Sequence, residues 1–136
     1  MLVGDIVTSN ARLYPKKICV VDDNVRLTWA QFNDRVNRLV NVLLGLGLKK
    51  GERLALCSEN RHEYAEILFA VAKAGLITVC LNYRLTTEQM LRIINDCQPR
   101  AIITEAKYVP ALETIAKNIE FVLGIGKKHA LSLIHI

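Results

Sequence analysis

One stretch of the sequence combines residue types that could bind a charged ligand. In AGLITVCLNYRLTTEQM, a predicted strand is followed directly by Asn82, Tyr83 and Arg84. Ligands of doubly wound α/β sheets collect at the carboxyl ends of strands, and a guanidinium fork suits phosphate, so Arg84 is our candidate for binding an anionic ligand. The alternative is an arginine that is solvated or paired with a carboxylate. Asn82 and Tyr83 also have ordinary interpretations, as a turn former and a half-buried ring.

Motifs for catalysis are absent from the sequence. It contains neither G-x-G-x-x-G nor G-x-x-x-x-G-K-[ST], and GLGLKKGE ends a predicted helix instead of opening one. No Ser, His and acid set stands at a recognisable spacing, and no carboxylate cluster suits a divalent ion. We therefore predict no catalytic and no metal-ligating residue here. His62, in the first turn of a predicted helix, is expected to face solvent, and Trp29 to pack against the start of its helix.

The composition is that of a globular domain. The chain has 136 residues, of which 51% are hydrophobic and 23% charged, enough for one domain or part of one. Its net charge of +5 comes from scattered lysines and arginines without interleaved aromatic residues, which argues against a nucleic-acid partner. The four cysteines lack C-x-x-C spacing and are expected to be reduced and mostly buried. No segment resembles a signal peptide or is long enough for a membrane span, so we expect a cytoplasmic protein.

Strands and helices are predicted to alternate along the chain. The strand patterns are ICVVDDN and VRLT, joined as a hairpin, followed by RLALCS, LITVCL, RAIIT and IEFVLGI. The helix patterns are a short amphipathic segment over 3–14, a long one capped by Thr28 and Gln31, an apolar one capped by Asn60 and Glu63, one capped by Thr86 and Gln89, and VPALETIAKN. Alternation over short connections predicts an α/β fold with a doubly wound, mostly parallel sheet and flanking helices.

The order of three segments carries a resemblance to a known family. LTWAQF, GERLALCSEN and AEILFAVAKAGLITVCLNYRLTTEQMLRIINDCQPRAIIT together resemble the N-terminal region of the acyl-adenylate-forming (AMP-binding) superfamily. The resemblance runs from Ile6 to Ile119, and LNYRLT looks most like the acid–CoA ligases. It implies that residues 1–130 are an incomplete N-terminal subdomain of an AMP-dependent synthetase.

The resemblance also implies a reaction. Such ligases join a carboxylic acid, here a fatty or related acid, to AMP by using ATP and Mg²⁺, and then exchange AMP for coenzyme A. Arg84 falls where some members place an arginine on the nucleotide phosphate of coenzyme A.

The chemistry-bearing parts of the family have no counterpart in this sequence. These are a Ser/Thr/Gly-rich phosphate loop ending in Pro-Lys-Gly, an acidic residue for the ATP ribose and a lysine in a mobile C-terminal domain. We expect the chain by itself to be inactive and to bind ATP, Mg²⁺ and coenzyme A poorly, because the groups that position and stabilise adenylyl transfer are missing. We also expect aggregation through an uncovered sheet edge.

The last six residues, LSLIHI, have a second interpretation. The codons CTG TCT CTT ATA CAC ATC encode this string, and they form the mosaic end of a transposase adapter used in sequencing libraries. We interpret residues 131–136 as a non-native tail on a truncated gene. The alternative is an ordinary terminal strand.

Three functions are open from the sequence. The first is the N-terminal part of an ATP-dependent acid–CoA ligase. The second is a stand-alone small α/β domain with a binding or regulatory role, although neither an acidic pocket nor a phosphate loop is visible at its strand ends. The third is another adenylate-forming reaction, either luciferase-like oxidation or amino-acid adenylation.

Overall fold

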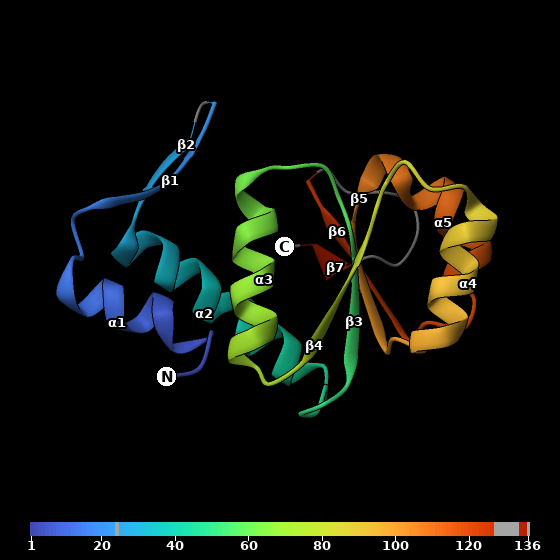
Figure 1. Cartoon of the computed structure of the whole chain (residues 1–136), viewed down its shortest axis with the longest axis horizontal. Coiled ribbons are helices and arrows are strands. Elements are labelled where there is room, and N and C mark those ends of the chain that lie inside the picture. Colours follow the sequence, from blue (N-terminus) through green and yellow to red (C-terminus); the bar gives the residue numbers. More distant parts are fainter. Residues whose placement is uncertain (24, 127–133, 136) are drawn as a thin grey trace. The chain divides into compact units, whose positions relative to one another are not determined.

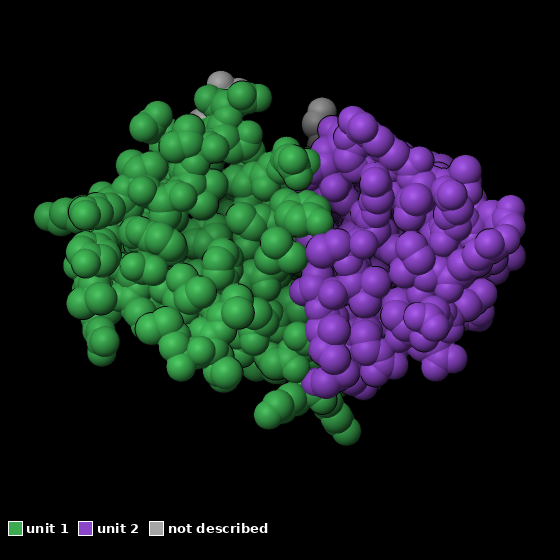
Figure 2. All heavy atoms as spheres, in the orientation of Figure 1, with its two compact units in different colours: residues 1–50, 60–76 green, residues 51–59, 77–136 purple. Residues whose placement is uncertain are grey.

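The computed structural model describes residues 1–23, 25–126 and 134–135 (Figure 1). The chain divides into two compact units (Figure 2). Unit 1 comprises Met1–Lys50 and Asn60–Leu76, and unit 2 comprises Gly51–Glu59 and Ile77–Ile136.

Unit 1 consists of helices and a β-hairpin. Its elements are α1 (Asp5–Leu13), β1 (Ile18–Asp22), β2 (Val25–Thr28), α2 (Trp29–Gly45) and α3 (His62–Lys73). β1 pairs with β2 in antiparallel fashion, as the hairpin pattern predicted. Thr28 starts α2 with the predicted capping box, since its hydroxyl accepts the Gln31 N–H while the Gln31 side chain accepts the Thr28 N–H. Trp29 packs edge-on against Phe32 at this helix start, as predicted.

The start of α3 differs from the sequence prediction. Asn60 does not cap this helix, which begins at His62 after the N-cap residue Arg61. Instead, the backbone N–H of His62 donates to the Asp22 carboxylate at 2.9 Å. The last residue of β1 therefore satisfies an open donor of α3 and places a negative charge at its positive end.

Lys73, the last residue of α3, joins this helix to α1 and α2. Its ammonium donates to Thr8 Oγ1 on α1 at 2.6 Å, and to the side-chain oxygens of Asn33 and Asn37 on α2 at 3.3 and 2.6 Å. Gly4 lies directly against this residue, because a Cβ on Gly4 would be 2.7 Å from Lys73 Cα. The close approach of α1 to α3 thus requires a glycine at this position.

Unit 2 is built on a parallel sheet (Figure 1). Its elements are β3 (Arg53–Cys57), β4 (Ile77–Leu81), α4 (Thr87–Cys97), β5 (Ala101–Glu105), the 3-10 turn η1 (Ala106–Tyr108), α5 (Val109–Ala116), β6 (Phe121–Ile125) and β7 (Ile134–His135). The strand order is β4-β3-β5-β6-β7, and each neighbouring pair is parallel. The order reverses at β3, which has β4 on one side and β5 on the other, as in doubly wound sheets. The predicted fold class is confirmed.

Helices α4 and α5 cover one face of this sheet (Figure 1). The core between them is formed by apolar side chains of the strands, of both helices and of the connection from α5 to β6: Ala55, Cys57, Leu81, Met90, Ile94, Ile102, Leu112, Ile115 and Ile119. Thr86 begins α4 with the predicted capping box to Gln89. The α4 helix ends at Cys97, and its C-cap residue Gln98 adopts a left-handed conformation with φ of 45° just before Pro99.

The cysteines are less buried than the sequence predicted. Cys57 is buried in the core, Cys19 and Cys97 are partly buried, and Cys80 is exposed. Cys80 lies on β4, which ends the sheet among the described residues and has no neighbouring strand on its outer side. Burial raises the pKa of the Cys57 thiol.

Part of the predicted tail lies outside the described residues, namely 131–133 and 136. Residues 134–135 form β7, which pairs with β6. Either origin of the tail accommodates this pairing, so the adapter interpretation stays a prediction. Among the residues that the structure describes, no helix is both long and apolar enough to cross a membrane.

Candidate functional site

Polar side chains gather at the carboxyl ends of three neighbouring strands in unit 2. We call them the strand-end cluster: Ser58 and Glu59 after β3, Tyr83 and Arg84 after β4, Glu105 at the end of β5, and Lys107 and Tyr108 in η1. Parallel strands bring these ends to one edge of the sheet. The strand order reverses there, between β3 and β5, which is where ligands of doubly wound sheets bind.

Glu105 is the buried centre of the strand-end cluster, with 7% of its surface exposed. Its Oε1 accepts hydrogen bonds from Ser58 Oγ and from the backbone N–H of Glu59, both at 2.7 Å. Its Oε2 lies 3.5 Å from Lys107 Nζ. Two donors and a cation therefore stabilise a carboxylate whose burial alone would be unfavourable.

Glu59 holds two side chains of η1. Its Oε1 lies 2.9 Å from Lys107 Nζ and accepts a hydrogen bond from the Tyr108 hydroxyl at 2.8 Å. The hydrogen bond to Glu59 raises the pKa of Lys107, so this amine stays protonated at neutral pH. Burial, together with the hydrogen bond to Glu59, raises the pKa of the Tyr108 hydroxyl. Lys107 is thus a cation whose charge is balanced by carboxylates, and Tyr108 is a neutral donor.

The ring of Tyr108 connects η1 to the loop after β4. It stacks on Tyr83 with 5.9 Å between ring centroids and 28° between planes. The guanidinium carbon of Arg84 lies 5.5 Å from the centroid of the Tyr83 ring, within cation–π distance. The backbone N–H of Arg84 donates to Asn82 Oδ1 at 3.0 Å, so Asn82 acts as the predicted turn former.

Arg84 itself is exposed, and no carboxylate of the described residues pairs with it. The salt-bridge alternative therefore does not hold within this part of the chain. The structure places Arg84 at the predicted strand end, and its role in binding an anion stays a prediction.

Sequence reasoning missed the other charged members of the strand-end cluster, Glu59, Glu105 and Lys107, together with Tyr108. Each of them ends or follows β3 or β5, just as Arg84 follows β4. The strand-end rule that selected Arg84, applied to every predicted strand, would have found them.

A second polar cluster lies in unit 1, at the start of α3. His62 Nδ1 is 3.1 Å from Asp22 Oδ2 and 3.3 Å from Glu63 Oε2, a mixed set that could hold a metal ion. Arg61, however, already occupies Glu63 through contacts of 2.7 and 2.9 Å to its two oxygens. Because this guanidinium supplies the positive charge that a metal would bring, we assign no metal site here.

The same cluster corrects the prediction for His62. Its side chain is only 15% exposed, so the expectation that it faces solvent is wrong. The reason is that Asp22, at the end of the hairpin strand β1, meets both the backbone and the ring of His62.

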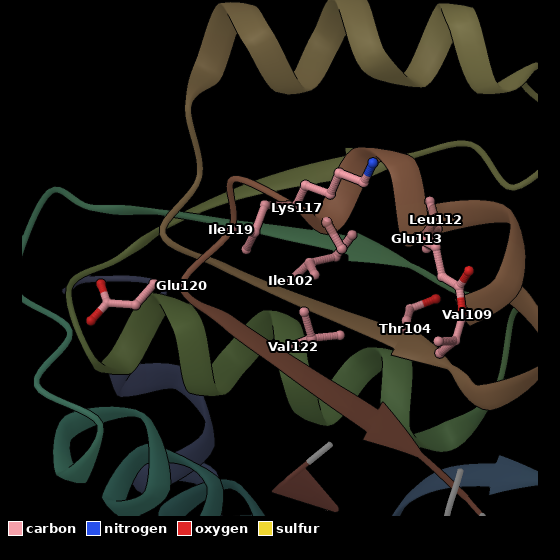
Figure 3. Close-up of a pocket in the computed structure, with 10 residues that line it drawn as sticks. Ile102, Thr104, Val109, Leu112, Glu113, Lys117, Ile119, Glu120 and Val122 are labelled. Atoms are coloured by element: carbon pink, nitrogen blue, oxygen red, sulfur yellow. The ribbon is translucent and has the colours of Figure 1, made fainter. Parts of the chain in front are cut away.

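A cavity of about 260 Å³ lies beside α5 in unit 2 (Figure 3). Ile102 and Val122 of the sheet are among the mainly apolar side chains that line it. Figure 3 shows its charged groups, Glu113, Lys117 and Glu120, at separate points of the lining. They do not converge on one position as the groups of the strand-end cluster do, so we take the strand-end cluster as the candidate site.

Nearly the whole chain matches a single protein family. Residues 7–131 match the family model described as AMP-binding enzyme. The long-chain-fatty-acid–CoA ligase FadD13 of Mycobacterium tuberculosis is 31% identical over 115 residues, which cover 83% of this chain and 23% of the relative. The crotonobetaine/carnitine–CoA ligase of Salmonella typhimurium is 32% identical over 93 residues, which cover 68% and 18%. The chain thus spans less than a quarter of the length of these relatives.

A solved structure of a CoA ligase has a similar fold over nearly all of this chain. The anthranilate CoA ligase AuaEII in complex with anthranoyl-AMP matches with a TM-score of 0.92 and 26% identity, over 98% of this chain and 26% of that one. The match supports the arrangement described above for the N-terminal part of such proteins.

Proposed function

This chain belongs to the AMP-binding enzyme family, since the family model matches residues 7–131, and we propose that it is the N-terminal part of an ATP-dependent carboxylic acid–CoA ligase. The complete enzyme would join a fatty or related carboxylic acid to AMP and then transfer the acyl group to coenzyme A. The observation that carries the proposal is the similarity to proteins described as CoA ligases, in sequence and in fold.

In this proposal, Arg84 binds the nucleotide phosphate of coenzyme A. Its guanidinium is exposed at a strand end and pairs with no carboxylate of the described residues, and its planar set of donors suits phosphate. Lys107 fits this role less well, because Glu59 and Glu105 already balance its charge.

We assign neither ATP nor Mg²⁺ to residues of this chain. The carboxylates of the strand-end cluster, Glu59 and Glu105, are held by Lys107, Ser58 and Tyr108, so they do not fit the oxygen shell that Mg²⁺ requires. The contribution proposed for unit 2 is therefore to the coenzyme A step of the complete enzyme.

The test compares Arg84→Ala with Arg92→Ala in the complete enzyme. Arg92 is an exposed arginine on α4 that pairs with Glu88, so its loss removes the same charge away from the strand ends. We expect Arg84→Ala to raise KM for coenzyme A about 10- to 100-fold, the equivalent of a charge-assisted hydrogen bond worth about 1.5–3 kcal/mol. Arg92→Ala should leave this KM unchanged.

Two partial measurements separate the alternatives. Acid-dependent ATP–pyrophosphate exchange, which reports adenylation, should be the same in both variants and the parent enzyme. Dephospho-coenzyme A should not distinguish the variants, because it lacks the phosphate in question. An unchanged KM in Arg84→Ala would remove Arg84 from the proposal, and an enzyme that adenylates acids but makes no acyl-CoA would favour a luciferase-like or amino-acid-adenylating relative.

A further inference from the structure

We propose that Tyr83 and Tyr108 form a positioning element that holds the Arg84 guanidinium ready for phosphate. The inference rests on the proposed role of Arg84 in binding coenzyme A. Neither tyrosine is proposed to touch the reacting atoms; both act through Arg84.

The need for such an element follows from the exposure of Arg84. A free arginine side chain has many rotamers, and part of this rotamer entropy is lost when it binds a ligand. Contact with the Tyr83 ring, at 5.5 Å from the guanidinium carbon to the centroid, restricts the side chain before the ligand arrives. A cation–π contact uses the face of the ring and consumes none of the N–H donors, which stay available for phosphate.

Tyr83 is itself held in place by Tyr108 and by the core of unit 2. It stacks on Tyr108 with 5.9 Å between centroids, and both rings pack against the core under α4 and α5. The Tyr108 hydroxyl donates to Glu59 at 2.8 Å, and the backbone N–H of Glu59 donates to the buried Glu105 at 2.7 Å. Arg84 is therefore connected through two rings and two carboxylates to the carboxyl ends of β3 and β5.

The backbone of the loop is fixed independently of the rings. Asn82 accepts the N–H of Arg84 on its side chain and the N–H of Leu85 on its carbonyl, both at 3.0 Å. The Thr86 capping box then begins α4. Loss of the Tyr83 ring should consequently free the Arg84 side chain while the loop backbone keeps its place.

The experiment measures KM for coenzyme A in Tyr83→Leu and Tyr83→Phe of the complete enzyme. Tyr83→Leu removes the ring and should raise this KM about two- to fivefold, the value of an exposed cation–π contact of about 0.5–1 kcal/mol. Tyr83→Phe keeps the ring and should behave like the parent enzyme. ATP–pyrophosphate exchange should be unchanged in both, which also shows that the variants are folded.

A double-mutant cycle with Arg84→Ala distinguishes positioning from other roles. Once Arg84 is absent, Tyr83→Leu should have no further effect on KM for coenzyme A. Tyr108→Phe, which loses only the hydroxyl bound to Glu59, should raise KM in the same direction and by less than Tyr83→Leu. With dephospho-coenzyme A, all these differences should disappear.

The possible outcomes separate this inference from the proposed function. If Arg84→Ala raises KM and Tyr83→Leu does not, the positioning role is overturned and the role of Arg84 stands. If Tyr83→Leu raises KM equally with and without Arg84, the ring contacts the ligand directly, and the inference is again overturned. If neither variant changes KM while exchange activity persists, the coenzyme A role of Arg84 fails, and the positioning role fails with it.

Discussion

Replacing Gly4 with alanine should destabilise unit 1, because the added methyl group would clash with the backbone of α3. Gly4 is the N-cap residue of α1 with φ of −61°, a backbone conformation open to any residue. The added Cβ would nevertheless lie 2.7 Å from Cα and 3.0 Å from N of Lys73. These are backbone atoms, which no change of rotamer can move away.

The magnitude follows from how far α1 must move. Ordinary contact begins at 3.4 Å, so the distance from the new Cβ to Lys73 Cα must grow from 2.7 Å to at least that value. The movement would stretch the hydrogen bond of 2.6 Å from Lys73 Nζ to Thr8 Oγ1. Overpacking of this kind costs about 1–3 kcal/mol, and we expect the free energy of unfolding to fall by about 2 kcal/mol.

Gly45→Ala is the matched control. Gly45 is the last residue of α2, and a Cβ there would meet nothing within 4 Å. Alanine should therefore stabilise unit 1 by up to about 1 kcal/mol through helix propensity. Urea unfolding followed by circular dichroism measures both changes. A Gly4→Ala variant that unfolds at the same urea concentration as the parent chain, or a higher one, would refute the close approach of α1 to α3.

Three further predictions concern single side chains. Glu66 is only 3% exposed and pairs with the Arg35 guanidinium at 2.6 Å. Arg35→Ala would leave this carboxylate without its partner and should lower the free energy of unfolding by about 3 kcal/mol. A change below about 0.5 kcal/mol in urea unfolding would contradict this. The backbone hydrogen bond from His62, at the start of α3, lowers the pKa of Asp22 in the folded chain. The ionised Asp22 carboxylate therefore stabilises the fold above its unfolded pKa of about 4, and this contribution is lost as the pH falls through the lower pKa of the folded chain. Asp22→Asn should therefore flatten the acid limb of a curve of melting temperature against pH, and an unchanged curve would count against it. A thiol reagent such as DTNB should label exposed Cys80 in the folded chain and reach buried Cys57 only on unfolding, whereas equal labelling rates would be contrary to the described burial.

Local features of this fold were predictable from the sequence. The capping boxes that join Thr28 to Gln31 and Thr86 to Gln89 form as predicted, because all their partners lie within one helical turn. The same holds for the alternation of elements and for parallel pairing, since short connections leave few other topologies.

Features that depend on distant residues were not predictable in this way. Asn60 and Glu63 have the spacing of a cap, yet α3 is capped by Asp22, which precedes His62 by 40 positions. The low exposure of His62 follows from the same long-range contact. No pattern of neighbouring residues encodes it, because it arises only when the hairpin packs against α3.

The candidate site likewise contains one residue that could be predicted from local sequence and others that could not. Arg84 could be selected because it directly follows a predicted strand. The roles of Glu105 and Tyr108 emerge only from contacts between the segments after β3, β4 and β5, which are far apart in sequence. The cytoplasmic location, the tendency to aggregate and the adapter origin of residues 131–136 stay predictions.

The most direct test of the ligase proposal is to read the source gene across codon 136 and assay the complete protein with ATP, Mg²⁺, coenzyme A and a panel of carboxylic acids. We expect a frame that continues into a Ser/Thr/Gly-rich phosphate loop and a protein that forms acyl-CoA from a fatty or related acid. A stop codon directly after codon 136, or a complete protein that forms acyl-CoA from none of the acids, would contradict it.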